Sequence, residues 1–135
     1  MPSPRRTHRR LLALILLLAT IAAGIGIHYG FPAGTVSDVS GDVLYAVAAY
    51  LAVVLVAPRL RPLWAGAIAA GWCVAVELFQ LTGIPLQLGD AFPPAMLVLG
   101  TVFDARDLVL YIGAAAALVL IDTLVTSRRG SAQSR

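Results

Sequence analysis

The stretch 63–81, LWAGAIAAGWCVAVELFQL, decides the fold class of this chain. Its nineteen residues contain one charged side chain, Glu77. An α-helix of this length would extend about 28 Å, which is enough to cross the hydrocarbon core of a bilayer. The stretch therefore predicts a transmembrane helix with a carboxyl group inside it.

Three further apolar runs accompany this stretch, at 11–27, 43–57 and 108–125. The composition agrees, because 59% of the 135 residues are hydrophobic and 13% are charged, against about 45–50% and about 25% in soluble domains. We predict an all-α polytopic membrane protein with about four transmembrane helices, forming one domain over 1–135. The run 43–57 is short for a span, so we expect Asp42 at the membrane boundary.

The loop 82–106 does not fit a span, because glycines and prolines interrupt it. Within it, 95–99 is uninterrupted apolar sequence that is too short to cross a bilayer. We expect a short interfacial or re-entrant helix here. The alternative is an extended loop packed over the ends of the helices.

The arginines predict the orientation, because cytoplasmic loops accumulate basic residues. If both termini are cytoplasmic, nine of the ten arginines lie on the cytoplasmic side and Arg106 alone lies outside. We therefore predict a multi-pass cell-membrane protein with both termini in the cytoplasm. A cleavable signal peptide ending near Thr20 and Ala22 is the alternative reading of the first run.

Several classes of function find little support in the residues. Cys73 is the only cysteine, so the chain cannot form an internal disulfide or a cysteine-based metal cage. The basic residues are all arginine, which is typical of a GC-rich, bacterial genome, and they lie beside apolar runs rather than on a face suited to nucleic acid. No nucleophile motif, metal-ligand spacing or phosphate-binding loop is present. We expect no cofactor, an enzyme is the least supported class, and the sequence leaves metal binding open.

Polar residues at one level of three spans form the candidate site. An unpaired carboxylate at the position of Glu77 is costly in a membrane, and Gln80 lies on the same helix face. Asp42 and Asp107 open the second and fourth spans on the same side, each with a tyrosine one turn deeper. If these spans pack together, one outward-facing acidic pocket contains Asp42, Tyr45, Glu77, Gln80, Asp107 and Tyr111.

Structural readings of the acidic residues stay open beside this pocket. Asp42 and Asp107 would also suit the N-terminal ends of their helices, where the helix dipole favours an acid. Asp122 lies near the opposite end of the fourth span, close to Arg128 and Arg129, where we expect a boundary charge that either reaches the interface or is paired.

Four segments that follow one another along the chain resemble a known protein family. They are 41–50 (GDVLYAVAAY), 76–81 (VELFQL), 97–103 (LVLGTVF) and 107–113 (DLVLYIG). Together they resemble the bacterial DUF2809 family of small integral membrane proteins, over about residues 11 to 120. That family is of unknown function. The Glu77 and Gln80 pattern is more distantly similar to the VanZ-like family, which is linked to glycopeptide resistance and thought to act on envelope lipids. The stretch 82–103 contains no basic residue, so an anion-binding role is not implied.

Three functions are compatible with these features. The first is binding or handling of an envelope lipid or amphiphile through the acidic pocket, with membrane lipid as the partner and no nucleic acid. The second is an accessory or structural membrane protein whose polar cluster locks the helices together. The third is a small proton-coupled transporter that exchanges a proton at Glu77 for a cationic substrate. An oligomer or a membrane protein partner stays open.

Overall fold

The computed structural model describes residues 4–131, and this part of the chain consists of helices and loops without a strand. Four of the helices are long and apolar enough to cross a membrane, which confirms the predicted all-α fold with four spans. The elements are α1 (Pro4–Gly30), α2 (Thr35–Val56), α3 (Pro62–Gln80), α4 (Ile84–Ala91), the 3₁₀ helix η1 (Pro93–Ala95), α5 (Met96–Leu99) and α6 (Ala105–Ser131).

Three of the long helices extend beyond the apolar runs that predicted them. The largest difference is at α2, which begins at Thr35 instead of Val43, so Asp42 lies about two turns inside it. The physical reason is that backbone hydrogen bonds carry a helix through polar residues, whereas hydropathy marks only the apolar part. Asp42 is therefore not an N-terminal capping residue, and that alternative is wrong.

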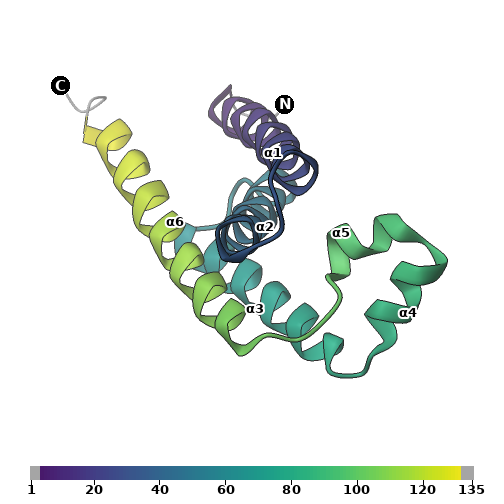
Figure 1. Ribbon diagram of the computed structural model, residues 1–135. Helices are drawn as coiled ribbons and strands as arrows, with labels where there is room; N and C mark the ends of the chain where they lie inside the picture. Colours follow the sequence, from purple (N-terminus) through teal and green to yellow (C-terminus); the bar gives the residue numbers. More distant parts are fainter. Residues whose placement is uncertain (1–3, 132–135) are drawn as a thin grey trace.

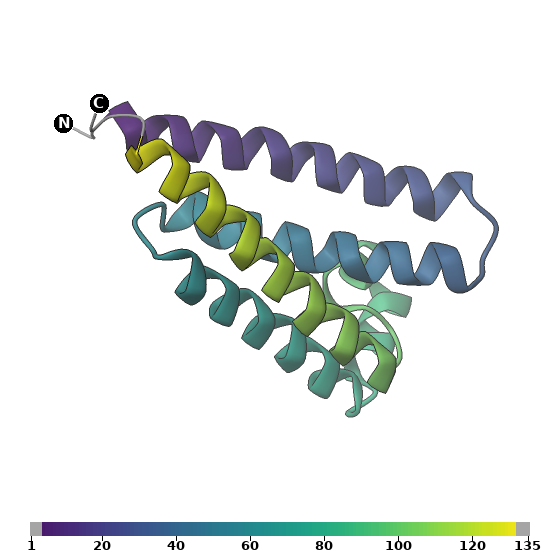
Figure 2. The ribbon, with the colours of Figure 1, turned by 90° about the vertical axis from the view of Figure 1, so that its left-hand side faces the viewer.

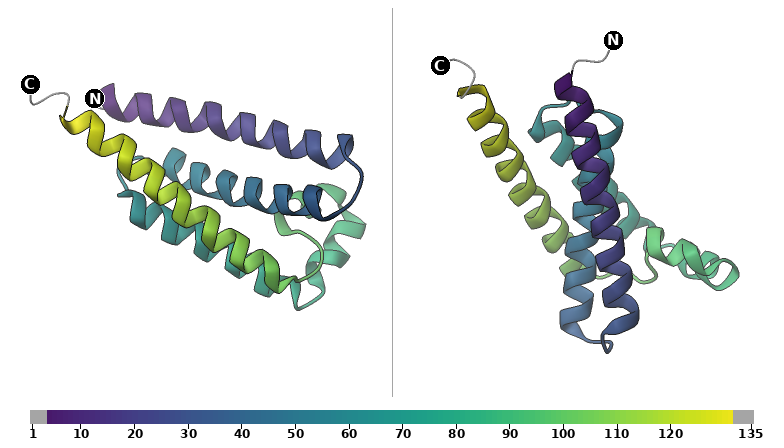
Figure 3. Two further views of the ribbon diagram at one scale, coloured as in Figure 1. Left: turned by 60° about the vertical axis from the view of Figure 1, so that its left-hand side comes forward. Right: turned by 90° about the horizontal axis from the view of Figure 1, so that it is seen from above.

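The long helices form a bundle with α2 at its centre. The helix α2 packs against α1, α3 and α6, and α3 also packs along α6. Figure 2 shows both ends of the described chain on one side of the bundle, with the α1–α2 connection on the opposite side. We call these sides the terminal end and the groove end. Figure 3 shows α1 running along α2, and no other described helix packs along α1.

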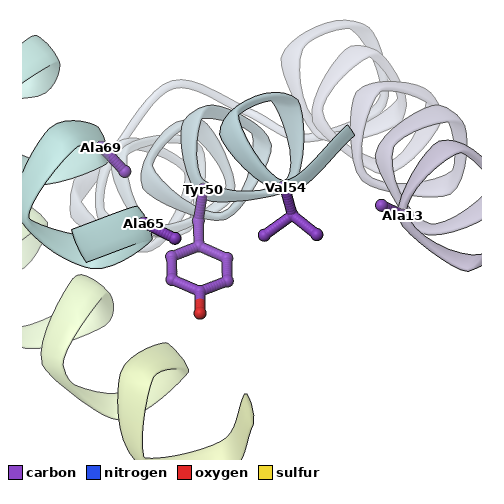
Figure 4. Packing of buried hydrophobic residues seen from close by; sticks show 5 residues of the cluster. All are labelled: Ala13, Tyr50, Val54, Ala65 and Ala69. Atoms are coloured by element: carbon purple, nitrogen blue, oxygen red, sulfur yellow. The ribbon is translucent and has the colours of Figure 1, made fainter. Parts of the chain in front are cut away.

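Small residues allow these helices to approach closely. Ala13, Tyr50, Val54, Ala65 and Ala69, from α1, α2 and α3, form one buried cluster (Figure 4). A Cβ atom at Gly66 would collide with Val119 of α6, so this glycine is required by the contact between α3 and α6.

The glycine pair Gly26 and Gly30 in α1 behaves differently, because the space around both residues is open. Glycines four residues apart often lie where two helices approach closely in a membrane, but no described helix approaches these two.

The segment Ile84–Leu99, from α4 to α5, forms a hairpin that stands beside the bundle at the groove end (Figure 1). We call it the hairpin. It packs against α3, and Gly83 and Gly100, both with positive φ angles, flank it. The sequence predicted one short helix around 95–99, and the structure contains α4, η1 and α5 in this segment. The large apolar side chains of these short helices are mostly exposed.

Candidate functional site: an acidic cluster beside an apolar groove

The first pair of acids, Asp42 of α2 and Asp107 of α6, meets at the groove end. Arg106 lies nearby, with Nη2 3.5 Å from Asp107 Oδ1 and 3.9 Å from Asp42 Oδ2. Asp42 Oδ2 is buried and has no hydrogen-bond partner, so the longer ion pair leaves it unsatisfied.

Asp104, rather than Asp107, caps the start of α6. Its Oδ1 accepts a hydrogen bond from the backbone N–H of Arg106 at 2.8 Å, and its Oδ2 lies 3.7 Å from the Arg106 guanidinium. Asp107 sits in the first turn, where the helix dipole favours an acid. A dipole role is therefore compatible with Asp107, together with its ion pair to Arg106.

Glu77 of α3 lies behind this pair and has no exposed surface. Its Oε1 accepts a hydrogen bond from the backbone N–H of Asp104 at 2.5 Å, so it holds the chain immediately before α6. Its Oε2 is buried without a partner. We call Asp42, Glu77, Asp104 and Asp107 the acidic cluster; the three aspartates share the guanidinium of Arg106, and Glu77 has no ion pair with it.

Gln80 connects α3 to the end of the hairpin. Its Nε2 donates to the backbone oxygen of Leu99 at 3.0 Å, while its Oε1 is buried without a partner. The amide occupies the space that a Cβ atom at Gly100 would need. A glycine at this position satisfies both the positive φ of 62° and the close approach of Gln80.

The tyrosines that were predicted to lie near the acids also meet. Tyr45 donates its hydroxyl to the backbone oxygen of Val98 at 2.6 Å and accepts from Trp72 Nε1 at 3.0 Å. The ring of Tyr111 lies 5.9 Å from that of Tyr45. Tyr45 and Gln80 thus each attach the hairpin to the bundle through its backbone.

A groove of about 550 Å³ opens beside the cluster, between α1, α2 and the hairpin. Four of the six predicted residues line it, namely Asp42, Tyr45, Gln80 and Tyr111, whereas Glu77 and Asp107 do not. Its walls are largely apolar, including Ile21, Ile25, Leu44, Met96 and Leu97. The predicted pocket is therefore divided: four of its residues line the groove, whereas the buried Glu77 and the partly buried Asp107 lie outside the lining.

Charge and composition limit what the groove can hold. Asp38 and Asp42 line it, and no arginine or lysine does. Among the residues that the structure describes, no group of three or more His, Cys, Asp or Glu side chains is arranged to hold a metal ion. The site combines apolar surface with hydrogen-bond acceptors and negative charge.

One family model matches the part of the chain that contains the acidic cluster. Residues 31–114, more than half of the chain, match the model of DUF2809, described as a protein of unknown function. The chain belongs to the DUF2809 family. No curated protein and no solved structure matches it.

The DUF2809 match contains the whole acidic cluster but leaves out both charged residues of the second polar cluster of the molecule. That second cluster lies at the terminal end, where Asp122 Oδ2 accepts hydrogen bonds from Arg9 Nη2 and from the Tyr50 hydroxyl, both at 2.7 Å. Arg9 also donates to the backbone oxygens of Pro58 and Leu60, at 2.8 and 3.0 Å. Arg9 and Asp122 both lie outside the matched residues.

Sequence reasoning missed this terminal-end cluster. It predicted a boundary charge at Asp122 that reaches the interface or is paired, and the structure shows it paired, with Arg9 of the first helix as the partner that the sequence did not identify. The side chain of residue 129 lies outside the described residues. A usable signal existed, because an even number of spans places Arg9 and Asp122 at the same end of the bundle.

Proposed function

We propose that this DUF2809 protein binds an amphiphilic molecule of the membrane in the groove. The observation that carries the proposal is the groove itself, whose apolar walls meet Asp42, Tyr45 and Gln80 at one end. An alkyl chain would lie along α1 and α2, and a polar head group would reach the acceptors. Sites for small molecules typically combine apolar walls with a few placed polar groups in this way. The distant likeness to the VanZ-like family is in keeping with an envelope lipid as the ligand.

A matched pair of glycine substitutions tests this binding. Gly24 lines the groove and Gly113 does not, and both have open space where a side chain would be added. We expect native mass spectrometry of the purified protein to show one saturable adduct with a hexadecyl probe carrying an amine, hydroxyl or phosphate group. Gly24→Leu should remove the adduct and Gly113→Leu should keep it. Absence of an adduct with every probe, or an adduct that survives Gly24→Leu, would overturn the proposal.

We also propose that both termini face the cytoplasm of the cell membrane, so that the groove opens on the outer side. The arginine distribution supports this orientation. Single cysteines at Ser131 and at the exposed Asp90, in a Cys73→Ser background, should react differently with an impermeant thiol reagent in intact cells. Labelling at Asp90 and protection at Ser131 is the expected result, and the reverse would refute the orientation.

A structural role is the second candidate, because three side chains of the predicted site bond to backbone atoms near the hairpin. Tyr45 bonds to Val98, Gln80 to Leu99 and Glu77 to Asp104. Under this alternative the cluster only fixes the hairpin and α6, and no ligand occupies the groove. The glycine pair above separates the two, since a purely structural cluster predicts no saturable adduct.

A further inference from the structure

Three polar side chains that line the groove have a hydrogen-bonding atom without a partner among the described residues. Gln80 of α3 is 8% exposed, and its Oε1 is buried and unpaired. The side chain of Asp42 of α2 is 19% exposed, and its Oδ2 is likewise buried and unpaired. Tyr111 of α6 is 6% exposed, and its hydroxyl forms no hydrogen bond to another described residue. Three helices thus bring two unpaired acceptors and one unpaired hydroxyl to a single groove.

Neighbouring donors at this end of the groove are already engaged. The Tyr45 hydroxyl donates to the Val98 backbone oxygen and accepts from Trp72. Gln80 Nε2 donates to the Leu99 backbone oxygen at 3.0 Å, and because a backbone oxygen only accepts, this bond leaves Oε1 as the unpaired half of the amide. These donors are therefore not available to the unpaired oxygens. A buried acceptor without a donor costs free energy, so a ligand that supplies donors is stabilised there.

The charges around the groove favour a neutral head group. Arg106 does not line the groove, but its Nη2 lies 3.9 Å from Asp42 Oδ2, so Asp42 has a counterion although this oxygen accepts no hydrogen bond. Asp38 and His28 also line the groove, and their charges are opposite in sign when both are ionised. An ammonium group would compete with Arg106 for Asp42, and a phosphate would be repelled by the two acids. The site lacks hydrogen-bond donors rather than a counter-charge.

We propose that the groove selects a neutral amphiphile whose head group carries hydroxyls, as in a glycerol monoether or monoester. The hydroxyls donate to the unpaired oxygens of Asp42 and Gln80 and form a hydrogen bond with the Tyr111 hydroxyl, while the alkyl chain lies along α1 and α2. A hydroxyl suits this set because it both donates and accepts. This inference rests on the proposed amphiphile binding and names its head group.

The probes for the test share one hexadecyl chain and differ in the head group. Hexadecylglycerol, a monoether with two hydroxyls, is compared with its dimethyl ether, which keeps the oxygens as acceptors and has no donor. We expect the diol to bind about tenfold or more tightly, because the dimethyl ether leaves the acceptors of the groove unpaired. Hexadecylamine and hexadecyl phosphate should each bind more weakly than the diol. Native mass spectrometry in an amine oxide detergent gives the Kd values, because sugar detergents carry the hydroxyls under test.

Tyr111→Phe locates the effect with little disturbance, because it removes only a hydroxyl that has no partner among the described residues. It should weaken diol binding about three- to tenfold, with an unfolding midpoint equal to that of the unchanged protein when no ligand is present. Tyr29→Phe makes the same change at an exposed position outside the groove lining and should bind the diol as the unchanged protein does.

A second pair of variants separates hydrogen bonding from charge at Asp42. Asp42→Asn keeps an acceptor and removes the charge, so it should keep the preference for the diol over its dimethyl ether. Asp42→Leu has a similar size and no acceptor, and it should reduce that preference. Because the preference is a ratio of two affinities measured on one variant, a lower yield of folded protein does not decide the result.

The outcomes separate this inference from the proposed function. Equal Gly24-dependent binding of the diol and its dimethyl ether, or tightest binding of the amine or the phosphate, would overturn the inference and leave amphiphile binding in place. Diol binding that is unchanged in both Tyr111→Phe and Asp42→Leu would also overturn it. A lack of Gly24-dependent binding for every probe would refute both.

Discussion

The two polar clusters of this bundle differ in how completely their charges are matched. At the terminal end, Asp122 accepts from Arg9, Tyr50 and Thr126, and Arg9 also donates to two backbone oxygens. At the groove end, the acidic cluster has one arginine and retains buried oxygens without partners. A satisfied network fixes a structure, whereas an unsatisfied one in a membrane costs free energy. The comparison indicates that the terminal end holds the helices together, and the unmatched acids of the groove end are what the proposed ligand site would use.

The largest effect is expected when the network of Arg9 and Asp122 at the terminal end is broken. Arg9→Gln would leave Asp122 without its cation and two backbone oxygens without their donor. Removing one partner of a buried ion pair costs about 3–5 kcal/mol, and the partial exposure of this pair reduces the expected loss to about 2–3 kcal/mol. Unfolding in detergent, followed by circular dichroism, would measure the loss.

Arg59→Gln is the matched control, because Arg59 is exposed at the same end of the bundle. It removes the same positive charge and should change stability by less than about 0.5 kcal/mol. Equal losses in the two variants would mean that net charge, rather than the Arg9 network, stabilises the terminal end.

A smaller loss is expected from Glu77→Leu at the groove end. It removes the acceptor for the backbone N–H of Asp104, which would then be unpaired at a cost of about 1–3 kcal/mol. Glu77→Gln keeps an acceptor at that position and removes the partnerless anionic oxygen, so its midpoint of thermal unfolding should be higher than that of Glu77→Leu. A Gln variant as unstable as the Leu variant would show that the charge of Glu77, and not its hydrogen bond, matters for folding.

The smallest effect is expected at Gly100, which directly follows the hairpin. Gly100→Ala places a side chain against Gln80 and in a backbone conformation (φ 62°, ψ −160°) essentially restricted to glycine, which costs about 1–2 kcal/mol, mostly local to the hairpin. Gly113→Ala, with open space on α6, should be neutral or slightly stabilising. Amide hydrogen exchange over 84–100 would show faster exchange in the Gly100 variant alone. Uniformly faster exchange across α3 and α6 would contradict a local effect.

The sequence contained enough information for the helices but not for the details of the site. Long apolar runs predict spans because a bilayer requires about twenty apolar residues, and the shared level of Asp42, Glu77 and Asp107 followed from the topology. Which of these acids line the groove depends on the rotation of each helix about its own axis. Hydropathy contains no information about that rotation. The bonds from Tyr45 and Gln80 to the hairpin depend on loop conformation, which has no sequence period to reveal it.

The way α1 is attached limits how a ligand could reach the groove. At the terminal end Arg9 and Arg10 bond to the backbone around the α2–α3 connection, and at the groove end only residues 31–34 separate α1 from α2. Because α1 is attached at both ends, it resists moving away from α2 and the groove. The opposite wall, α5, is held chiefly by side-chain contacts to its backbone, which are individually weak. Access from the bilayer would therefore lie on the side of α5, and a disulfide tying α5 to α3 would slow the exchange of bound molecules without altering the groove's walls.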